Sequence, residues 1–195
     1  MTFDPTDYDA VVYDLDGTVV DLAVDWGAVA DDVLAVYAGE AIKPPGDDLW
    51  DLLGAAEEYG IGDAVEAAIA EHERDGARRS TRLPLGDRLA GEGEREGRNG
   101  GNGDERGPIA VCSLNCEAAC RIALGTHGID GEVDAVVGRD TVATYKPDPE
   151  PLLAALDALG ADPGRAVFVG DSDRDAVTAE RAGVPFVWVA DAVDA

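Results

Sequence analysis

The chain has 195 residues, which is long enough to bury a real core and too short for two full-sized domains. It carries 41 Asp and Glu against 15 Lys and Arg, and its formal net charge of −26 excludes the basic surface that nucleic acids and anionic membranes require. Because most of the cations are Arg and the apolar residues are mainly Ala and Val, the composition predicts adaptation to concentrated salt, where dense carboxylates hold water and cations.

The first predicted element is a buried strand over residues 10–13, a mostly β-branched run that ends at an acidic loop. Three helical patterns follow it and are separated by breaks rich in Pro and Gly. They cover residues 26–38, 49–59 and 64–78. Together they predict a helical cap over residues 21–82, inserted after the first strand.

The sequence Leu83-Pro84-Leu85-Gly86 marks the return of the chain to its core. Residues 91–107 then contain seven glycines and no apolar side chain, so they cannot contribute to a core. We expect a flexible polar loop at the surface. A partner-binding role for this loop is the alternative that its composition favours less.

The remainder of the chain alternates apolar runs with helical patterns. The runs predict buried strands over residues 109–112, 135–137, 166–169 and 186–189. Two helices are predicted, over 150–159 and 174–182, and each is followed by a glycine that provides a stop. The first has an apolar stripe formed by Leu152, Leu153, Leu156 and Leu159.

This alternation predicts an α/β fold. We expect a Rossmann-like parallel sheet with helices on both faces, built from residues 1–20 and 83–195, in addition to the small helical cap. In such sheets ligands bind beyond the carboxyl ends of the strands. The functional residues are therefore expected at that edge.

The three cysteines, Cys112, Cys116 and Cys120, are predicted to be small buried hydrophobic residues. An odd number of cysteines, with no export signal at the N-terminus, argues against a disulfide framework, and a zinc site would need further ligands. No apolar run approaches the length of a membrane span. The sequence thus favours a soluble cytoplasmic protein and does not specify an oligomeric state.

Polar motifs follow the predicted strands or precede a helix. The first is Asp14-Leu15-Asp16-Gly17-Thr18, and the second includes Ser113 and Asn115. The third contains Lys146, one of two lysines in the chain, set between Tyr145 and Pro147. The fourth is Gly170-Asp171-Ser172-Asp173-Arg174-Asp175. Acidic composition alone does not account for four such motifs in this order, each at an element boundary.

The set resembles the haloacid dehalogenase superfamily, in particular phosphoglycolate phosphatase-like members with a helical cap after the first strand. The resemblance implies that Asp14 is the nucleophile and Asp16 the general acid and base. A second carboxyl two residues from the nucleophile is able to protonate a leaving oxygen and later activate water.

The resemblance also implies that Ser113, Asn115 and Lys146 bind the transferring phosphoryl group. Gly17 allows the backbone to approach the phosphate closely. In a chain that uses Arg for nearly all its positive charge, Lys146 suggests a task that requires a compact ammonium ion.

The implied cofactor is Mg²⁺, which prefers oxygen ligands and retains water. Its ligands in this resemblance are Asp14, Asp16 through its backbone carbonyl, and Asp171. Asp175 is expected to hold Lys146 or a metal-bound water. Without the metal and Lys146 these carboxylates would repel one another strongly.

The predicted function is a magnesium-dependent phosphatase that hydrolyses a small phosphorylated metabolite, such as phosphoglycolate, through an aspartyl phosphate on Asp14. A phosphomutase of the same superfamily would use the same motifs and return the phosphoryl group to a sugar. A dehalogenase is disfavoured because Asp16 is present. A catalytically silent binding protein with this fold is disfavoured by the intact catalytic residues.

Overall fold

The computed structural model describes residues 3–96 and 107–193. Within these ranges, strands form a five-stranded parallel sheet in the order β5-β4-β1-β6-β7. Their bounds are β1 (Ala10–Tyr13), β4 (Ile109–Cys112), β5 (Ala135–Val137), β6 (Ala166–Gly170) and β7 (Phe186–Trp188). The expected α/β fold is therefore confirmed.

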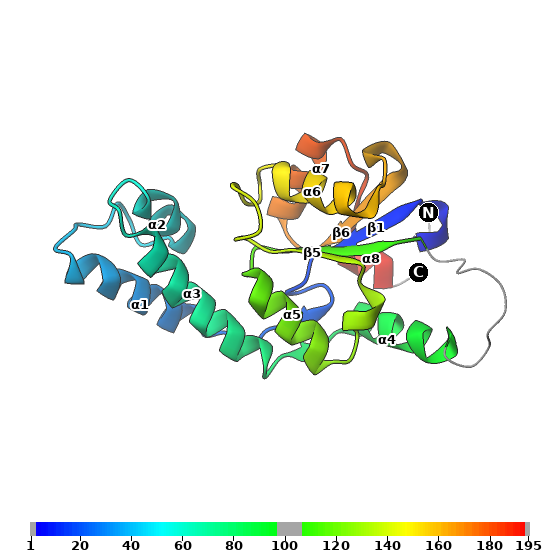
Figure 1. Ribbon diagram of the computed structural model, residues 1–195, viewed down its shortest axis with the longest axis horizontal. Coiled ribbons are helices and arrows are strands. Elements are labelled where there is room, and N and C mark those ends of the chain that lie inside the picture. The colour runs from blue at the N-terminus through cyan, green and yellow to red at the C-terminus, as the bar shows by residue number, and fades with distance from the viewer. Residues whose placement is uncertain (1–2, 97–106, 194–195) are drawn as a thin grey trace.

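Helices cover both faces of the sheet (Figure 1). One face carries α6 (Glu150–Leu159) and α7 (Asp173–Ala182), and the other carries α4 (Pro84–Glu96), α5 (Glu117–Thr126) and α8 (Val189–Val193). Short 3-10 turns lie at Pro5–Asp7, Asp130–Glu132 and Pro163–Arg165.

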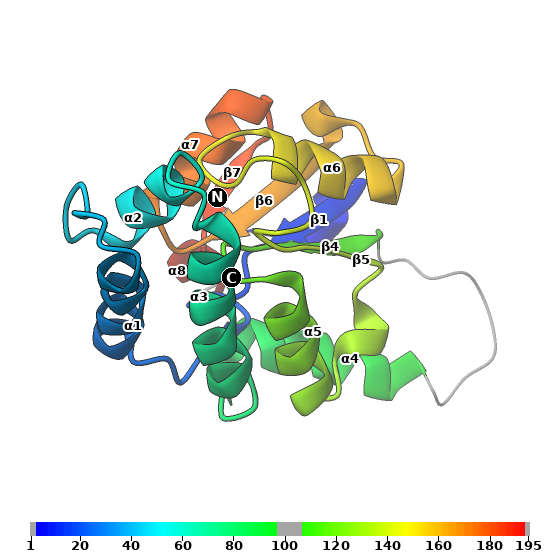
Figure 2. The same ribbon diagram turned by 60° about the vertical axis from the view of Figure 1, so that its left-hand side comes forward.

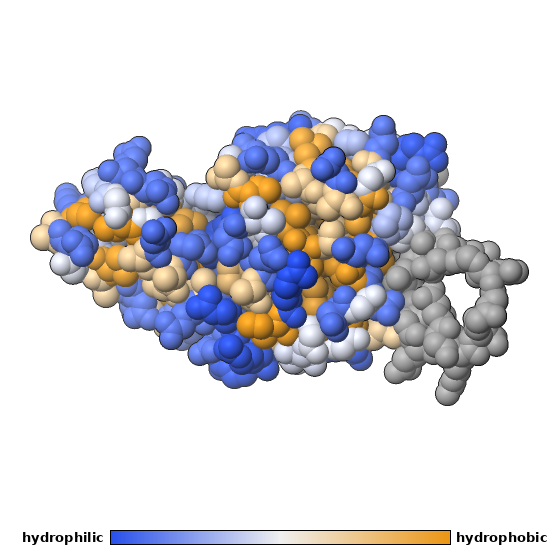
Figure 3. Space-filling model, in the orientation of Figure 1, coloured by the Kyte–Doolittle hydropathy of each residue, from blue (hydrophilic) through white to orange (hydrophobic). Residues whose placement is uncertain are grey.

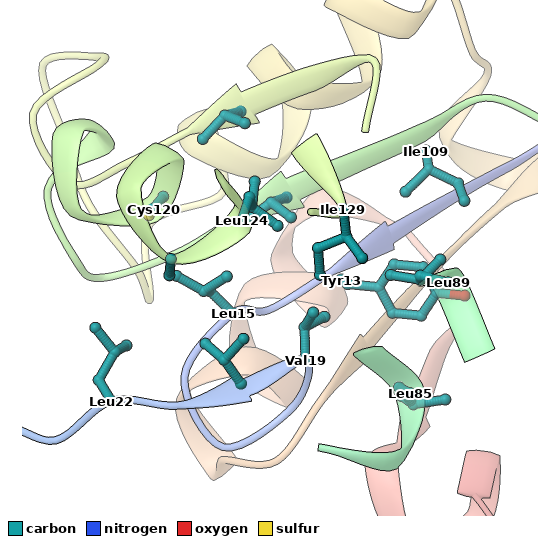
Figure 4. Packing of buried hydrophobic residues seen from close by; sticks show 14 of the residues in the cluster. Tyr13, Leu15, Val19, Leu22, Leu85, Leu89, Ile109, Cys120, Leu124 and Ile129 are labelled. Atoms are coloured by element: carbon teal, nitrogen blue, oxygen red, sulfur yellow. The ribbon is translucent and has the colours of Figure 1, made fainter. Parts of the chain in front are cut away.

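Strand β1 shows why the sheet needs this cover. Its four residues are buried, and successive side chains point to opposite faces. Val11 and Tyr13 belong to the hydrophobic cluster between the sheet and α5, part of which is drawn in Figure 4. Val12 points to the other face and packs with the leucines of α6. The central strand is thus fixed from both sides, and the loop that follows it begins from a rigid support.

A helical segment lies beside the sheet rather than on either face (Figures 1 and 2). It consists of α1 (Trp26–Gly39), α2 (Leu49–Ala56) and α3 (Gly62–Ala77), which pack around a hydrophobic cluster of their own. Asp25 and Asp48 cap α1 and α2 by accepting hydrogen bonds from the first free backbone N–H groups. This is the segment that the sequence predicts as a cap.

A two-stranded antiparallel ribbon connects the cap segment to the core. It pairs β2 (Val20–Asp21) with β3 (Thr81–Arg82). Because both chain connections pass through this ribbon, the helices leave the core and return to it at one place.

The predicted loop over residues 91–107 is wrong in its first part. Helix α4 continues to Glu96, so residues 91–96 are helical, and residues 97–106 lie outside the described part of the chain. Leu85 and Leu89 are one helical turn apart and both are buried, which anchors α4 on the sheet despite the low helix propensity of its glycines.

Other corrections are small. Helix α2 ends at Ala56 instead of Tyr59, and β7 ends at Trp188 because Val189 begins α8. The apolar stripe of α6 is narrower than expected, since Leu152 and Leu156 are buried but Leu153 is 39% exposed. Ser172 and Asp175 form a capping box that starts α7 one residue early, at Asp173.

Hydrophilic residues cover much of the face seen in Figure 3, over both the cap segment and the core, with hydrophobic areas between them. This fits a chain with 41 acidic residues. None of the described helices is both long and apolar enough to cross a membrane.

Candidate active site

Predicted site residues come together at the carboxyl edge of the sheet. Asp14 follows β1, Ser113 follows β4 and Asp171 follows β6. Because these strands are parallel neighbours, their carboxyl ends meet. A cavity of about 160 Å³ opens there, lined by Asp14, Asp16, Ser113, Asn115, Lys146, Asp171 and Asp175 from the predicted set, and by Trp26, Trp50, Leu114 and Ser172.

Lys146 is the buried cation of this cavity, with its side chain 2% exposed. Its Nζ donates hydrogen bonds to Asp14 Oδ1 at 2.7 Å and to Asp175 Oδ1 at 2.5 Å. A third hydrogen bond, of 3.1 Å, runs to the carbonyl oxygen of Cys112. Burial alone would lower the pKa of Lys146, but the two carboxylates outweigh it and raise the pKa. The amine is therefore charged.

Asp14, Asp171 and Asp175 form a carboxylate cluster in which one oxygen from each residue lies within 4.8 Å of the others. Burial raises the pKa of Asp14; Lys146 opposes this shift, and Asp175 adds to it. Burial and the neighbouring Asp175 also raise the pKa of Asp171. A divalent cation would relieve this repulsion, so the donor set fits Mg²⁺, which prefers carboxylate oxygens.

Gly17 makes room for the cluster. Its φ of +84° lies in the left-handed region, and a Cβ atom there would come within 2.2 Å of Asp171 Oδ2. Its own N–H donates to the carbonyl of Val20 at 2.8 Å. The observed contacts thus explain the glycine by close packing against Asp171, while its predicted role in binding phosphate stays a prediction.

Asp16 stands slightly apart from the other carboxylates. Its Oδ1 accepts the backbone N–H of Leu22 at 2.8 Å, and its side chain is not one of the three that make up the carboxylate cluster. Burial raises the pKa of Asp16 to about 6, although the hydrogen bond from Leu22 lowers it. A carboxyl group with such a pKa exchanges a proton readily near neutral pH.

Ser113 and Asn115 are buried in a tight turn after β4. Ser113 Oγ donates to Asn115 Oδ1 at 3.0 Å and accepts the backbone N–H of Asn115 at 3.1 Å. The turn holds the serine hydroxyl at the cavity wall, where the sequence predicts it.

Sequence reasoning missed four residues near the site. Trp26 and Trp50 reach the cavity from the cap segment. Glu73 and Arg139 form a buried ion pair beside the turn after β4. One signal was available: Val65, Ile69 and Glu73 are spaced four residues apart, which places the glutamate on the buried face of its helix.

The family model described as haloacid dehalogenase-like hydrolase matches residues 104–189. A phosphoglycolate phosphatase of Caulobacter vibrioides is 30% identical over 201 aligned residues, which cover 92% of this chain and 78% of that protein. A phosphoglycolate phosphatase of Rhodospirillum rubrum is 46% identical over 79 residues, which cover 40% of this chain. That match spans only 33% of the relative's own length.

Among solved structures, a HAD-superfamily hydrolase, subfamily IA, variant 1, of Geobacter sulfurreducens superposes with a TM-score of 0.56 at 26% identity. The superposition covers 93% of this chain and 89% of that one. The similarity therefore extends over the cap segment as well as the sheet.

Proposed function

Because the chain belongs to the haloacid dehalogenase-like hydrolase family, we propose that it is a magnesium-dependent phosphatase of small phosphate monoesters with Asp14 as its nucleophile. The observation that supports this most strongly is the buried Lys146, bonded to both Asp14 and Asp175 at the wall of the cavity. A buried ammonium ion next to a reactive carboxylate provides the positive charge that phosphoryl transfer requires.

In the first step, a carboxylate oxygen of Asp14 attacks the phosphorus and the bond to the leaving oxygen breaks. Asp16 gives its proton to that oxygen, and its raised pKa keeps part of this group protonated near pH 6. Lys146 stabilises the charge on the phosphoryl oxygens, since its ammonium group lies 2.7 Å from the nucleophile. The product is an aspartyl phosphate and a free alcohol.

In the second step, Asp16 takes a proton from water as the water oxygen attacks the phosphorus. The bond from phosphorus to Asp14 breaks, which releases inorganic phosphate and restores the carboxylate. Ser113 and Asn115 bind the phosphoryl oxygens in both steps. The Ser113 hydroxyl turns its single proton from Asn115 Oδ1 to a phosphoryl oxygen, while the backbone N–H of Asn115 still bonds to Ser113 Oγ and fixes the turn at the cavity wall.

Asp14 and Asp171, with the backbone carbonyl of Asp16, would hold Mg²⁺ in this proposal, and Asp175 would hold Lys146. When bound, the ion supplies charge neutralisation for the phosphate dianion, which otherwise repels a carboxylate nucleophile.

The substrate is a small phosphorylated metabolite. A cavity of about 160 Å³ leaves room for a phosphate with a short leaving group, and Trp26 and Trp50 of the cap segment bound it. Phosphoglycolate is the first candidate, because relatives of this chain bear the name phosphoglycolate phosphatase.

The test is phosphate release from a panel of phosphorylated acids and sugars in molar potassium chloride, with Mg²⁺ and with a chelator. We expect magnesium-dependent release of inorganic phosphate and a preference for small substrates. Product analysis of the same reactions separates the alternatives, because a phosphomutase would isomerise a sugar phosphate without releasing phosphate. Folded protein that does neither would contradict the proposal.

A further inference from the structure

Glu73 of α3 is a fully buried carboxylate, with 0% of its surface exposed. Its Oε2 accepts the backbone N–H of Cys116 at 2.9 Å, and its Oε1 accepts Asn115 Nδ2 at 3.3 Å. Arg139 Nη1 donates to Oε1 at 2.6 Å. A residue of the cap segment is thus bonded directly to the turn that carries Ser113.

Arg139 binds two carboxylates of the same helix. Its Nη2 and Nε donate to Glu66 at 2.7 Å and 2.9 Å, while Nη1 also reaches the carbonyl of Leu114 at 2.5 Å. Glu66 and Glu73 are seven residues apart, which places them two turns apart on one face of α3. The planar guanidinium fits both.

The two glutamates differ in what else they contact. Glu66 accepts hydrogen bonds from Arg139, and its side chain is 31% exposed. Glu73 bonds to the same guanidinium and, in addition, to Asn115 and Cys116. The ion pair between Arg139 and the partly exposed Glu66 is enough to join the cap segment to the core. Burying Glu73 as well adds a desolvation cost that this joining does not require.

The contact with Asn115 sets the orientation of its side chain. A carboxylate accepts hydrogen bonds and does not donate them, so the NH₂ group of Asn115 must face Glu73. The amide oxygen then faces Ser113 Oγ, which donates to it at 3.0 Å. A continuous chain of hydrogen bonds therefore leads from Glu73 through Asn115 to the Ser113 hydroxyl at the cavity wall.

We propose that Glu73 is a positioning residue for the phosphate site: from the cap segment it fixes the turn of Ser113 and Asn115 in the orientation that receives the phosphoryl group. Arg139 balances its charge. This inference rests on the proposed function of the cavity. It assigns Glu73 a role in catalysis although the residue does not line the cavity itself.

The experiment compares Glu73→Gln with Glu66→Gln. Both variants remove one negative charge facing the same guanidinium, but only the first alters the contacts of the turn. With para-nitrophenyl phosphate and Mg²⁺, we expect Glu73→Gln to raise KM and lower kcat/KM by about tenfold or more, because small displacements of binding groups are costly. Glu66→Gln should stay within about twofold of the wild type.

Two further measurements separate positioning from simple stability. The affinity for inorganic phosphate, measured by calorimetry, should fall in Glu73→Gln and not in Glu66→Gln. Hydrogen exchange of the segment 113–116 should accelerate only in Glu73→Gln, even if the thermal midpoints of both variants drop together. Glu73→Ala should enlarge both effects, and Glu73→Gln, which keeps the side-chain shape, covers the case in which the alanine variant fails to fold.

Equal phosphate affinities and equal exchange in the two variants would overturn the proposal and leave Glu73 as a structural contact. If the wild type hydrolyses no ester, the proposed function is wrong. The phosphate affinities and the hydrogen-exchange rates of the two variants still test whether Glu73 positions the turn. Wild-type protein that neither turns over esters nor binds phosphate would overturn both.

Discussion

In the described part of the chain, two buried cations each lie between two carboxylates, and the two groups differ in origin. Lys146 bonds to Asp14 and Asp175, both of which belong to the loops and helix starts at the edge of the sheet. Arg139 follows β5 and bonds to Glu66 and Glu73, which both come from a cap helix. The lysine group, Lys146 with Asp14 and Asp175, belongs to the core alone. The arginine group, Arg139 with Glu66 and Glu73, forms only where the cap segment meets the core.

The shape of each cation suits the contacts that it makes. The ammonium ion of Lys146 is a compact charge that can approach a phosphoryl oxygen, while the planar guanidinium of Arg139 holds two carboxylates in fixed directions. Removing one partner of a buried pair leaves an uncompensated charge. We therefore expect the lysine group to govern chemistry and the arginine group to govern the position of the cap and of the turn after β4.

The largest effect is expected from Asp14→Asn. An amide cannot act as the nucleophile, so turnover should fall by at least about 10³-fold while the fold is kept. Phosphate release and circular dichroism measure the two parts. The matched control is Asp9→Asn. Asp9 lies just before the start of β1, whereas Asp14 lies just after its end, and Asp9 pairs with Arg165 at the surface. Comparable loss in both variants would contradict the assignment of the nucleophile.

Lys146→Met should reduce turnover by about 10²- to 10³-fold, because it removes the positive charge next to the transferring group. It also leaves Asp14 and Asp175 unpaired, so the variant should unfold at lower temperature without Mg²⁺. Thermal scans with and without the ion test this. Lys43→Met changes the other lysine, which is exposed, and should alter neither quantity. Normal activity in Lys146→Met would contradict the claim that the lysine group governs the chemistry.

Arg139→Met should act mainly on stability. It leaves Glu73 buried without its cation, and we expect a loss of about 3–5 kcal/mol in the free energy of unfolding, with a smaller fall in turnover than Lys146→Met causes. Denaturant titration measures the loss. Arg165→Met removes an exposed pair with Asp9 and should change the free energy of unfolding far less, because solvent screens that pair. If the two arginine variants are equally stable, the arginine group does not join the cap to the core.

The smallest effect concerns pH. Where the cap segment returns to the core, His127 Nε2 lies 3.0 Å from Ser80 Oγ in a hydrogen bond. Burial, and after it the nearby Arg82, lowers the pKa of His127 below the ordinary 6.5. Asp87 opposes this shift. Below pH 6.5 the unfolded chain binds a proton that the folded protein does not, so stability falls as the pH drops through that value.

His127→Gln should remove this part of the pH dependence, as measured by thermal scans between pH 5 and pH 8, roughly the range in which histidine titrates. A slope that is unchanged in His127→Gln would show that other groups cause it.

The sequence predicted the edge of the sheet at which the lysine group lies, because the strands determine where that edge is. An apolar run followed by Asp or Ser indicates a strand end. Because parallel strand ends meet, Asp14, Ser113 and Asp171 could be assigned to one edge from the sequence alone. Lys146 was distinctive because lysine is rare in this chain.

The arginine group could not be predicted in the same way. Glu66 and Glu73 are two among 41 acidic residues, and their partner lies more than 60 positions along the chain. Only the apolar spacing of α3 indicated that Glu73 is buried. The helical residues 91–96 were missed for a related reason, because the burial of Leu85 and Leu89 on the sheet outweighs local glycine content.

The most direct test of the account is to find where the phosphoryl group resides during turnover. The protein with Mg²⁺ would be mixed with a labelled phosphate ester, quenched in acid within one turnover, and digested for peptide mapping. We predict the label on Asp14 in the peptide that spans β1 and its loop, and no label in Asp14→Asn. Phosphate release without labelled enzyme, or label on another residue, would contradict the central claim.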